Sequence, residues 1–286
     1  MRYTEFIHPE DASALKALQA IPGLSSIMKK VMDVGAEQLQ TGLNMATKVR
    51  LSPTQLPKLY YILPPICERL EIEEPEFYLE MSPVPNAYAF GDTQTAVTVT
   101  SALVEMMSEE ELTGVVAHEC GHIACRHMLY HTLAQVLANA TGLFETLAKL
   151  AVPIHYALMY WQRKSELSCD RAAAYIVGPK ATASMLARLA GGPISVTSEL
   201  NLEELAHQAD LYDALCKDGM WNKTLQTYAV MDRSHPFTAV RVREMLKWTG
   251  SPEYEEMVRA NPVCPHCHKA INRDWQYCQH CGKKLT

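Results

Sequence analysis

The segment "GVVAHECGHIACRHMLYH", from Gly114 to His131, places four histidines, two cysteines and one glutamate on what its apolar spacing predicts to be one helix. Burying so many polar groups costs free energy unless they have partners. His118 and His122 are four residues apart and share one helix face, while Glu119 lies about 100° round the helix from His118. This H-E-x-x-H pattern predicts that two imidazoles bind Zn²⁺ and that Glu119, kept off the metal, acts as general base.

A catalytic zinc needs a third protein ligand and keeps one position open. The segment "RKSELSCDRAAAYIVG" offers Glu166 and Asp170, four residues apart on a second apolar helix. We expect Glu166 to be the third ligand and Asp170 to accept the free ring N–H of a ligand histidine. Cys169 lies between them and is an alternative ligand that would compete with Glu166.

The other residues of the histidine-rich segment receive structural interpretations. Gly121 beside the second histidine ligand costs about 1 kcal/mol in a helix interior, which predicts that another segment approaches there. His127 and His131 lie about 180° and 220° round the helix from His118, so we expect them to face away from the zinc as surface or cap residues. Cys120 and Cys125 are expected to be small packed residues.

Elements that could position these residues follow from periodicity. Apolar residues at helical spacing run to about Glu71, and alternation with β-branched residues predicts two or three strands between Glu76 and Thr100. Ser108 and Glu111 form a predicted capping box at the start of the histidine-rich helix. The expected later helices are Ser101–Met107, Glu109–Asn139, Pro153–Val177, Leu202–Lys217 and one that begins after Pro236.

Composition limits the function classes. The 286 residues carry a net charge of −6, which argues against nucleic-acid binding. The N-terminus has no secretory signal, and the most apolar stretch, Leu150–Trp161, is shorter than the roughly 20 residues of a membrane span. We therefore expect a cytoplasmic protein without a membrane span, compatible with peripheral membrane contact near residues 143–161. Its nine cysteines are read as reduced thiols and metal ligands.

A second metal site is predicted in the tail, where "CPHC" at Cys264–Cys267 and "CQHC" at Cys278–Cys281 could close a four-thiolate structural zinc site. Gly282 suits the tight turn after the second knuckle. Alternatives are a redox dithiol, or replacement of a thiolate by one of the tail histidines, which are His266, His268 and His280. The expected role of this zinc ribbon is to dock a protein partner or substrate.

The stretches "GVVAHECGHIACRH", "SELSCDRAAA" and "SHPFTAVR" resemble the zinc metallopeptidases typified by the CAAX prenyl protease and the heat-shock protease HtpX. The resemblance covers roughly Pro75 to Leu246 and implies a gluzincin with an α+β, mainly α, zincin-like domain and a small edge sheet. It also implies that His235 stabilises the oxyanion and that Arg241 supports the site by ion pairing. The implied edge strand, which would hold an extended peptide by backbone pairing, consists of Asn86, Ala87, Tyr88 and Ala89.

Three parts are expected: a metallopeptidase domain over 1–250, a linker over 251–262 and the ribbon over 263–286. Within the first, 1–74 is a helical N-terminal part and 75–250 the catalytic core. The leading hypothesis is a zinc endopeptidase with one catalytic and one structural Zn²⁺, acting on peptide or protein substrates. The alternative is a catalytically silent binding protein that works through its ribbon. Many relatives carry transmembrane helices, so their membrane substrates are not expected here.

Overall fold

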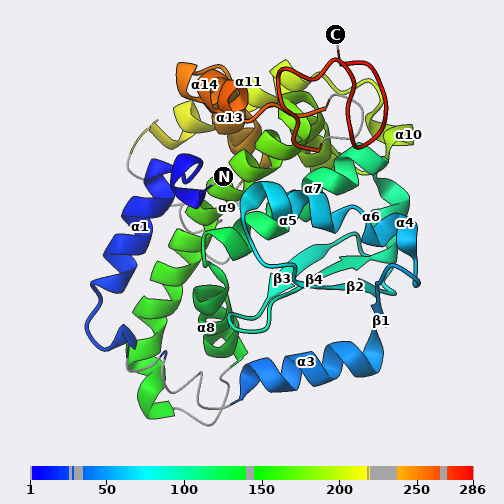
Figure 1. Ribbon diagram of the computed structural model, residues 1–286. Coiled ribbons are helices and arrows are strands. Elements are labelled where there is room, and N and C mark those ends of the chain that lie inside the picture. The colour runs from blue at the N-terminus through cyan, green and yellow to red at the C-terminus, as the bar shows by residue number, and fades with distance from the viewer. Residues whose placement is uncertain are drawn as a thin grey trace.

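The computed structural model describes residues 2–25, 28, 35–139, 145–217, 219, 237–264 and 269–285, and Figure 1 shows its arrangement. The N-terminal part is helical, as predicted. Its described residues form a 3-10 turn at Tyr3–Glu5 and the α-helices α1 Pro9–Gln19, α3 Ala36–Thr47, α4 Pro57–Tyr60 and α5 Leu63–Leu70. Pro9 opens α1, and the His8 ring caps it by accepting from the Glu10 N–H at 3.2 Å.

A small mixed sheet holds the predicted strands, β2 Glu76–Glu80, β3 Ala87–Phe90 and β4 Ala96–Thr100. A two-residue strand that the sequence did not predict, β1 Val49–Arg50, extends it to the order β1-β2-β4-β3. β4 pairs in parallel with β2 and antiparallel with β3, so β3 is an edge strand. All five residues of β4 are buried, which explains why its apolar and β-branched run marks the centre of the sheet.

The helix that carries the H-E-x-x-H pattern is shorter than predicted. After α6 Ser101–Met106, the capping box of Ser108 and Glu111 opens α7, as expected, but α7 ends at Ala124 and α8 spans Met128–Asn139. The break lies at Arg126, whose φ of 56° is left-handed. The prediction of one continuous helix over Glu109–Asn139 is therefore wrong, and the residues after the break no longer follow the helical angles of α7.

The second apolar helix, α9, runs over Glu145–Gly191, with a non-helical Gly178 where φ is 83°. It therefore begins before the predicted Pro153. Shorter helices follow at α10 Ile194–Thr197, α11 Leu202–Lys217, α13 Thr238–Thr249 and α14 Pro252–Ala260. The bounds of α11 match the prediction, and α14 occupies most of the segment expected to be a linker. Within the described residues, no helix is both long and apolar enough to cross a membrane.

The main core forms where α7 packs against α9, α5 and the sheet (Figure 1). Val115, Val116 and Ala117 of α7 belong to the same buried cluster as Ala172 and Ala173 of α9. A second buried cluster joins α1 to α8 and α9 through Leu18, Leu133, Leu158 and Trp161. The chain is thus mainly helical with a small mixed sheet, and α7 is held from both sides.

Candidate metal centre

Gly121 sets the distance between the two helices of the site. A Cβ at this position would meet the Ala172 Cβ at 3.0 Å and the Cys169 Cα at 3.1 Å, both on α9. The predicted close approach beside the second histidine is therefore present, and α9 is the segment that approaches. The contact brings the carboxylates of α9 opposite the imidazoles of α7.

His118, His122 and Glu166 meet in the buried interior, where their exposed fractions are 6%, 5% and 1%. The Nε2 atom of His118 lies 3.4 Å from Glu166 Oε2, and the Nε2 atom of His122 lies 3.4 Å from Glu166 Oε1. Two imidazole nitrogens and a carboxylate oxygen are a common ligand set for catalytic zinc. The residues present therefore fit a zinc ion between them.

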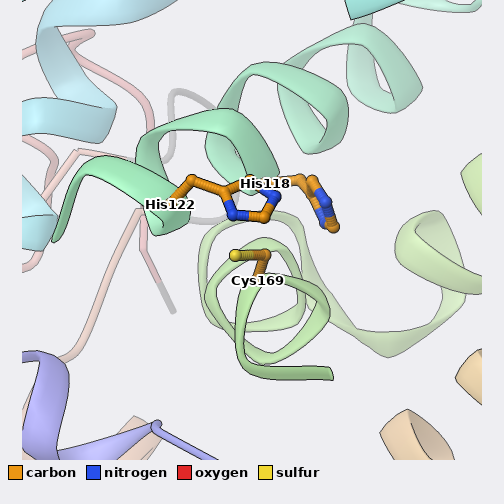
Figure 2. A group of neighbouring side chains, drawn as sticks. All are labelled: His118, His122 and Cys169. Atoms are coloured by element: carbon orange, nitrogen blue, oxygen red, sulfur yellow. The ribbon is translucent and has the colours of Figure 1, made fainter. Parts of the chain in front are cut away.

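Cys169 is also close to both histidines, as Figure 2 shows: the two imidazoles project from α7 towards the thiol on α9. Ligand atoms of His118, His122 and Cys169 all lie within 4.8 Å of one another. The thiol sulfur, however, is 3.8 Å from His127 Nδ1, the same atom that the Nδ1 of His122 contacts. Cys169 therefore lies on the Nδ1 side of the His122 ring, whereas Glu166 faces the Nε2 side, and burial raises the pKa of the thiol well above its ordinary value. This geometry favours Glu166 as the third ligand.

The other nitrogen of His118 faces Asp170. Its Nδ1 lies 3.1 Å from Asp170 Oδ1, and Arg241 holds that carboxylate by Nε at 2.8 Å and Nη2 at 2.6 Å. Arg241 also reaches Glu166 Oε2 with Nη1 at 3.1 Å. Burial lowers the pKa of His118, but Asp170 and Glu166 outweigh burial and raise it to about 9. The same negative charges would favour a metal cation in place of that proton.

The prediction that His127 and His131 face away from the centre is wrong. His127 follows the helix break, is fully buried, and brings its Nδ1 to 3.1 Å from the Nδ1 of His122. The His131 ring centroid lies 4.8 Å from that of His122. The helical angles of α7 do not apply here, because the left-handed Arg126 turns the chain back towards the site. Cys120 and Cys125, by contrast, are buried in the core as expected.

Beside His127 lies a further buried carboxylate that the sequence analysis did not predict. Asp11 of α1 is fully buried, and its Oδ2 lies 3.1 Å from the Nε2 of His127. Trp161 Nε1 donates to its Oδ1 at 3.0 Å, and Ser168 Oγ donates to its Oδ2 at 2.5 Å. Burial acts to raise the pKa of Asp11, but the hydrogen bonds and the charge of its neighbours hold it below the ordinary value.

A cavity of about 430 Å³ lies beside the centre. Glu119, His122 and Glu166 line it, as do residues 86–89 of the expected edge strand and the following Phe90. Glu119 Oε2 accepts a hydrogen bond from the Ala89 N–H at 2.9 Å, so its carboxylate lies directly at the strand edge. The cavity therefore brings together the predicted general base, two predicted ligands and the predicted substrate strand. His235 lies outside the described residues.

Three of the four predicted cysteines of the tail are described, and Cys264 and Cys278 make similar backbone hydrogen bonds. Cys264 N donates to Lys269 O at 2.9 Å, and Cys278 N donates to Lys283 O at 2.8 Å. Cys264, Cys278 and Cys281 have their sulfurs within 4.8 Å of one another, and Gly282 takes a φ of 72° in the second turn. Cys267, like His266 and His268, lies outside the described residues. Three sulfurs this close together suit a structural zinc.

Comparison with known proteins agrees with this organisation. The model for Peptidase family M48 matches residues 57–249, and a zinc-ribbon domain matches residues 263–285. "Plastoglobule-localized metallopeptidase 48, chloroplastic" from Arabidopsis thaliana is 35% identical over 264 residues, which cover 90% of this chain and 76% of the relative. A "Protease HtpX homolog" from Campylobacter concisus is 26% identical over 216 residues, covering 65% of this chain and 73% of the relative.

A crystal structure of Ste24p from S. mikatae aligns with a TM-score of 0.42 at 14% identity, over 82% of this chain and 62% of that chain. The family match spans α4 to α13 and so includes His118, His122, Glu166 and Arg241. The family uses zinc, and its relatives are named as proteases. The chain belongs to peptidase family M48, the zinc-dependent metallopeptidases, and ends in a zinc ribbon.

Proposed function

We propose that the chain is a zinc endopeptidase in which His118, His122 and Glu166 hold the catalytic zinc and Glu119 is the general base. The convergence of both Nε2 atoms on Glu166, beside a cavity that Glu119 also lines, is the observation that supports it most strongly. The proposal includes a zincin-like arrangement, in which an edge strand runs past the catalytic helix.

Zinc in this site would polarise a peptide carbonyl and lower the pKa of a water molecule towards 7. Glu119 accepts the proton of the attacking water and delivers it to the leaving amine. The Ala89 N–H, at 2.9 Å from Glu119 Oε2, orients the carboxylate for this transfer. Asp170 fixes the tautomer of His118 by accepting from Nδ1, which leaves the Nε2 lone pair for the metal. Arg241 holds Asp170 and Glu166 together.

The substrate on this proposal is an extended peptide that pairs with β3. The Thr100 N–H donates to the Asn86 carbonyl at 3.0 Å, so the backbone carbonyl of Asn86 points towards β4. Because bonding direction alternates along an antiparallel strand, the N–H and C=O groups of Ala87 and Ala89 point to the open edge. A peptide added there would run past Glu119 and the metal ligands, with backbone pairing as its main recognition.

The ribbon is proposed to hold a second, structural zinc through Cys264, Cys267, Cys278 and Cys281, and to dock a protein partner or substrate. His235 is proposed as the donor that stabilises the oxyanion. The predicted cytoplasmic location remains a prediction, since the name of the Arabidopsis relative places that protein in chloroplast plastoglobules.

Hydrolysis of denatured casein tests the proposal against the adaptor alternative. The full chain should release peptides, a chelator should stop the release, and Glu119→Gln should abolish it while keeping its zinc, because the amide cannot accept the proton. Glu110→Gln, at an exposed position of the same helix, is the matched control and should keep its activity. A zinc-loaded wild-type chain that releases nothing would favour the adaptor.

Zinc content tests the two sites separately. The intact chain should hold about two zinc ions by the ligand counts of the sites. Cys278→Ser and Glu166→Ala should each lose one, and the double variant should lose both. If Glu166→Ala kept two zinc ions while Cys169→Ala lost one, the third ligand would be wrongly assigned.

A further inference from the structure

The carboxylate of Asp11 has a position that the family match does not explain. It lies on α1, whereas the match begins at residue 57. A carboxylate that is fully buried costs free energy unless hydrogen bonds compensate it. Asp11 Oδ1 accepts a hydrogen bond from Trp161 Nε1, and Oδ2 accepts one from Ser168 Oγ. Both donors belong to α9. Its Oδ2 also faces the Nε2 of His127 at 3.1 Å.

His127 connects this carboxylate to the metal centre. Its Nδ1 contacts the Nδ1 of His122 at 3.1 Å, and its backbone N–H donates to the His122 carbonyl at 3.0 Å. The ring is fully buried, and the Trp161 ring packs edge-on against it with centroids 5.3 Å apart. Asp11, His127 and His122 therefore form a row of polar contacts that ends at a proposed zinc ligand.

The proton positions along this row follow from the ligand role of His122. If the Nε2 lone pair of His122 faces the metal, its Nδ1 carries the hydrogen and donates to the Nδ1 of His127. A neutral His127 then carries its own hydrogen on Nε2, the nitrogen that lies 3.1 Å from Asp11 Oδ2. Each ring thus has one tautomer that satisfies both ends of the row, the metal beside His122 and the carboxylate beside His127.

We propose that Asp11 is a positioning residue of the catalytic centre, which acts through His127 to fix the tautomer and ring orientation of the ligand His122. The inference rests on the proposed function, since it takes His122 as a zinc ligand. It makes the N-terminal helix part of the active site, although α1 lies outside the family match. It also gives each histidine ligand a carboxylate, direct for His118 and relayed for His122.

Asp11→Asn probes the relay with almost no change in shape. The Trp161 Nε1–H can only donate, so it requires the single oxygen of the amide. The amide nitrogen then faces the Nε2 of His127, which must give up its hydrogen and carry it on Nδ1. Two Nδ1–H groups would then oppose each other between His127 and His122. If Asp11 only joined α1 to α9, Asp11→Asn would leave the tautomer of His127 unchanged.

The test uses the zinc-loaded full chain labelled with ¹⁵N-histidine, with the His127 signal assigned by its loss in His127→Phe. We expect the Nε2–H tautomer of His127 in the wild type and the Nδ1–H tautomer in Asp11→Asn. Chelator competition should give a zinc affinity about tenfold weaker, as for other partners of ligand histidines. The double variant Asp11→Asn/His127→Phe should have the same zinc affinity as His127→Phe alone, because Asp11 acts through the His127 ring.

Two controls keep the outcomes distinct. Leu18→Ala removes a buried side chain from the same face of α1, so it should lower the melting temperature of the chain yet leave the tautomer and zinc affinity unchanged. Glu166→Ala identifies the catalytic zinc in the competition curve. If that variant loses its zinc while Asp11→Asn keeps wild-type affinity and tautomer, the relay is refuted. If neither affects zinc, the proposed function itself fails.

Discussion

The two proposed histidine ligands are supported in different ways. His118 contacts the carboxylate of Asp170 directly, and Arg241 on α13 neutralises that carboxylate. His122 reaches a carboxylate only through His127, and that carboxylate, Asp11, is held by the neutral donors Trp161 and Ser168. The first arrangement, the direct arm, lies within the family match, whereas the second, the relayed arm, ends outside it. The direct arm therefore pairs its carboxylate with a guanidinium beside the first histidine, whereas the relayed arm holds its carboxylate one imidazole ring further from the centre.

The largest expected effect comes from breaking the direct arm. Asp170→Asn leaves the buried Arg241 guanidinium without one of its two negative partners, and it leaves a single oxygen to accept from both Arg241 and His118. We expect zinc affinity to fall on the order of 10–100-fold and the unfolding free energy to fall by about 3 kcal/mol, as for a broken buried ion pair.

Chelator competition and thermal unfolding measure both quantities. Asp213→Asn makes the same chemical change at the half-exposed ion pair with Arg243 and should cost less than about 1 kcal/mol. A loss of zinc affinity in Asp170→Asn that is smaller than in Asp11→Asn would reverse the ranking of the two arms.

A smaller loss of stability and of zinc affinity is expected from moving α7 and α9 apart. Gly121→Ala gains about 1 kcal/mol of helix propensity, but its methyl group would press on the Cys169 backbone and move α9, with a net cost of about 1–2 kcal/mol. Zinc affinity should fall because Glu166 moves with α9.

Gly114→Ala on the same helix is the matched control. Its methyl group would meet only side-chain ends, Met185 Sδ at 3.1 Å and Val177 Cγ2 at 3.2 Å. It should therefore leave zinc affinity unchanged. Equal zinc affinities in the two alanine variants would show that the close approach at Gly121 does not position the ligands.

The juxtaposition of the proposed ligands and Asp170 could be predicted because each pair lies inside one unbroken helical stretch. His118 and His122, and likewise Glu166 and Asp170, are four residues apart, and helix geometry places such pairs on one face. The partner helix at Gly121 was predictable too, since glycine is costly in a helix without a packing reason. Arg241, more distant in the chain, entered only through the family resemblance.

The relayed arm could not be predicted from spacing. No glycine, proline or asparagine marks the break at Arg126. Helical spacing therefore predicts that His127 and His131 point away from the metal centre, although the helix has already ended before them. Asp11 lies in the first turn of α1, where acidic residues are common because they favour the helix dipole. Its contact with His127 depends on how α1 packs on α9, which local sequence does not encode.

The smallest expected effect is the pH dependence of the relayed arm. The pKa of Asp11 is held below its ordinary value, so the stability it contributes is present above the unfolded pKa of about 3.9 and is lost as pH falls through the folded pKa. The wild type should be more stable than Asp11→Asn by roughly 1–2 kcal/mol between pH 5 and 7. Thermal melts should show this difference shrinking below about pH 4. A difference that widens towards acid would mean that Asp11 is protonated in the folded chain.

The central claim is that one catalytic zinc lies between α7 and α9, held by His118, His122 and Glu166. Anomalous diffraction at the zinc edge from crystals of the full chain tests it most directly. The predicted result is a peak about 2.0–2.2 Å from the Nε2 atoms of both histidines and from one Glu166 oxygen, with a separate peak in the ribbon. A peak about 2.3 Å from Cys169 Sγ with Glu166 turned away, or no peak between the two helices, would contradict the account.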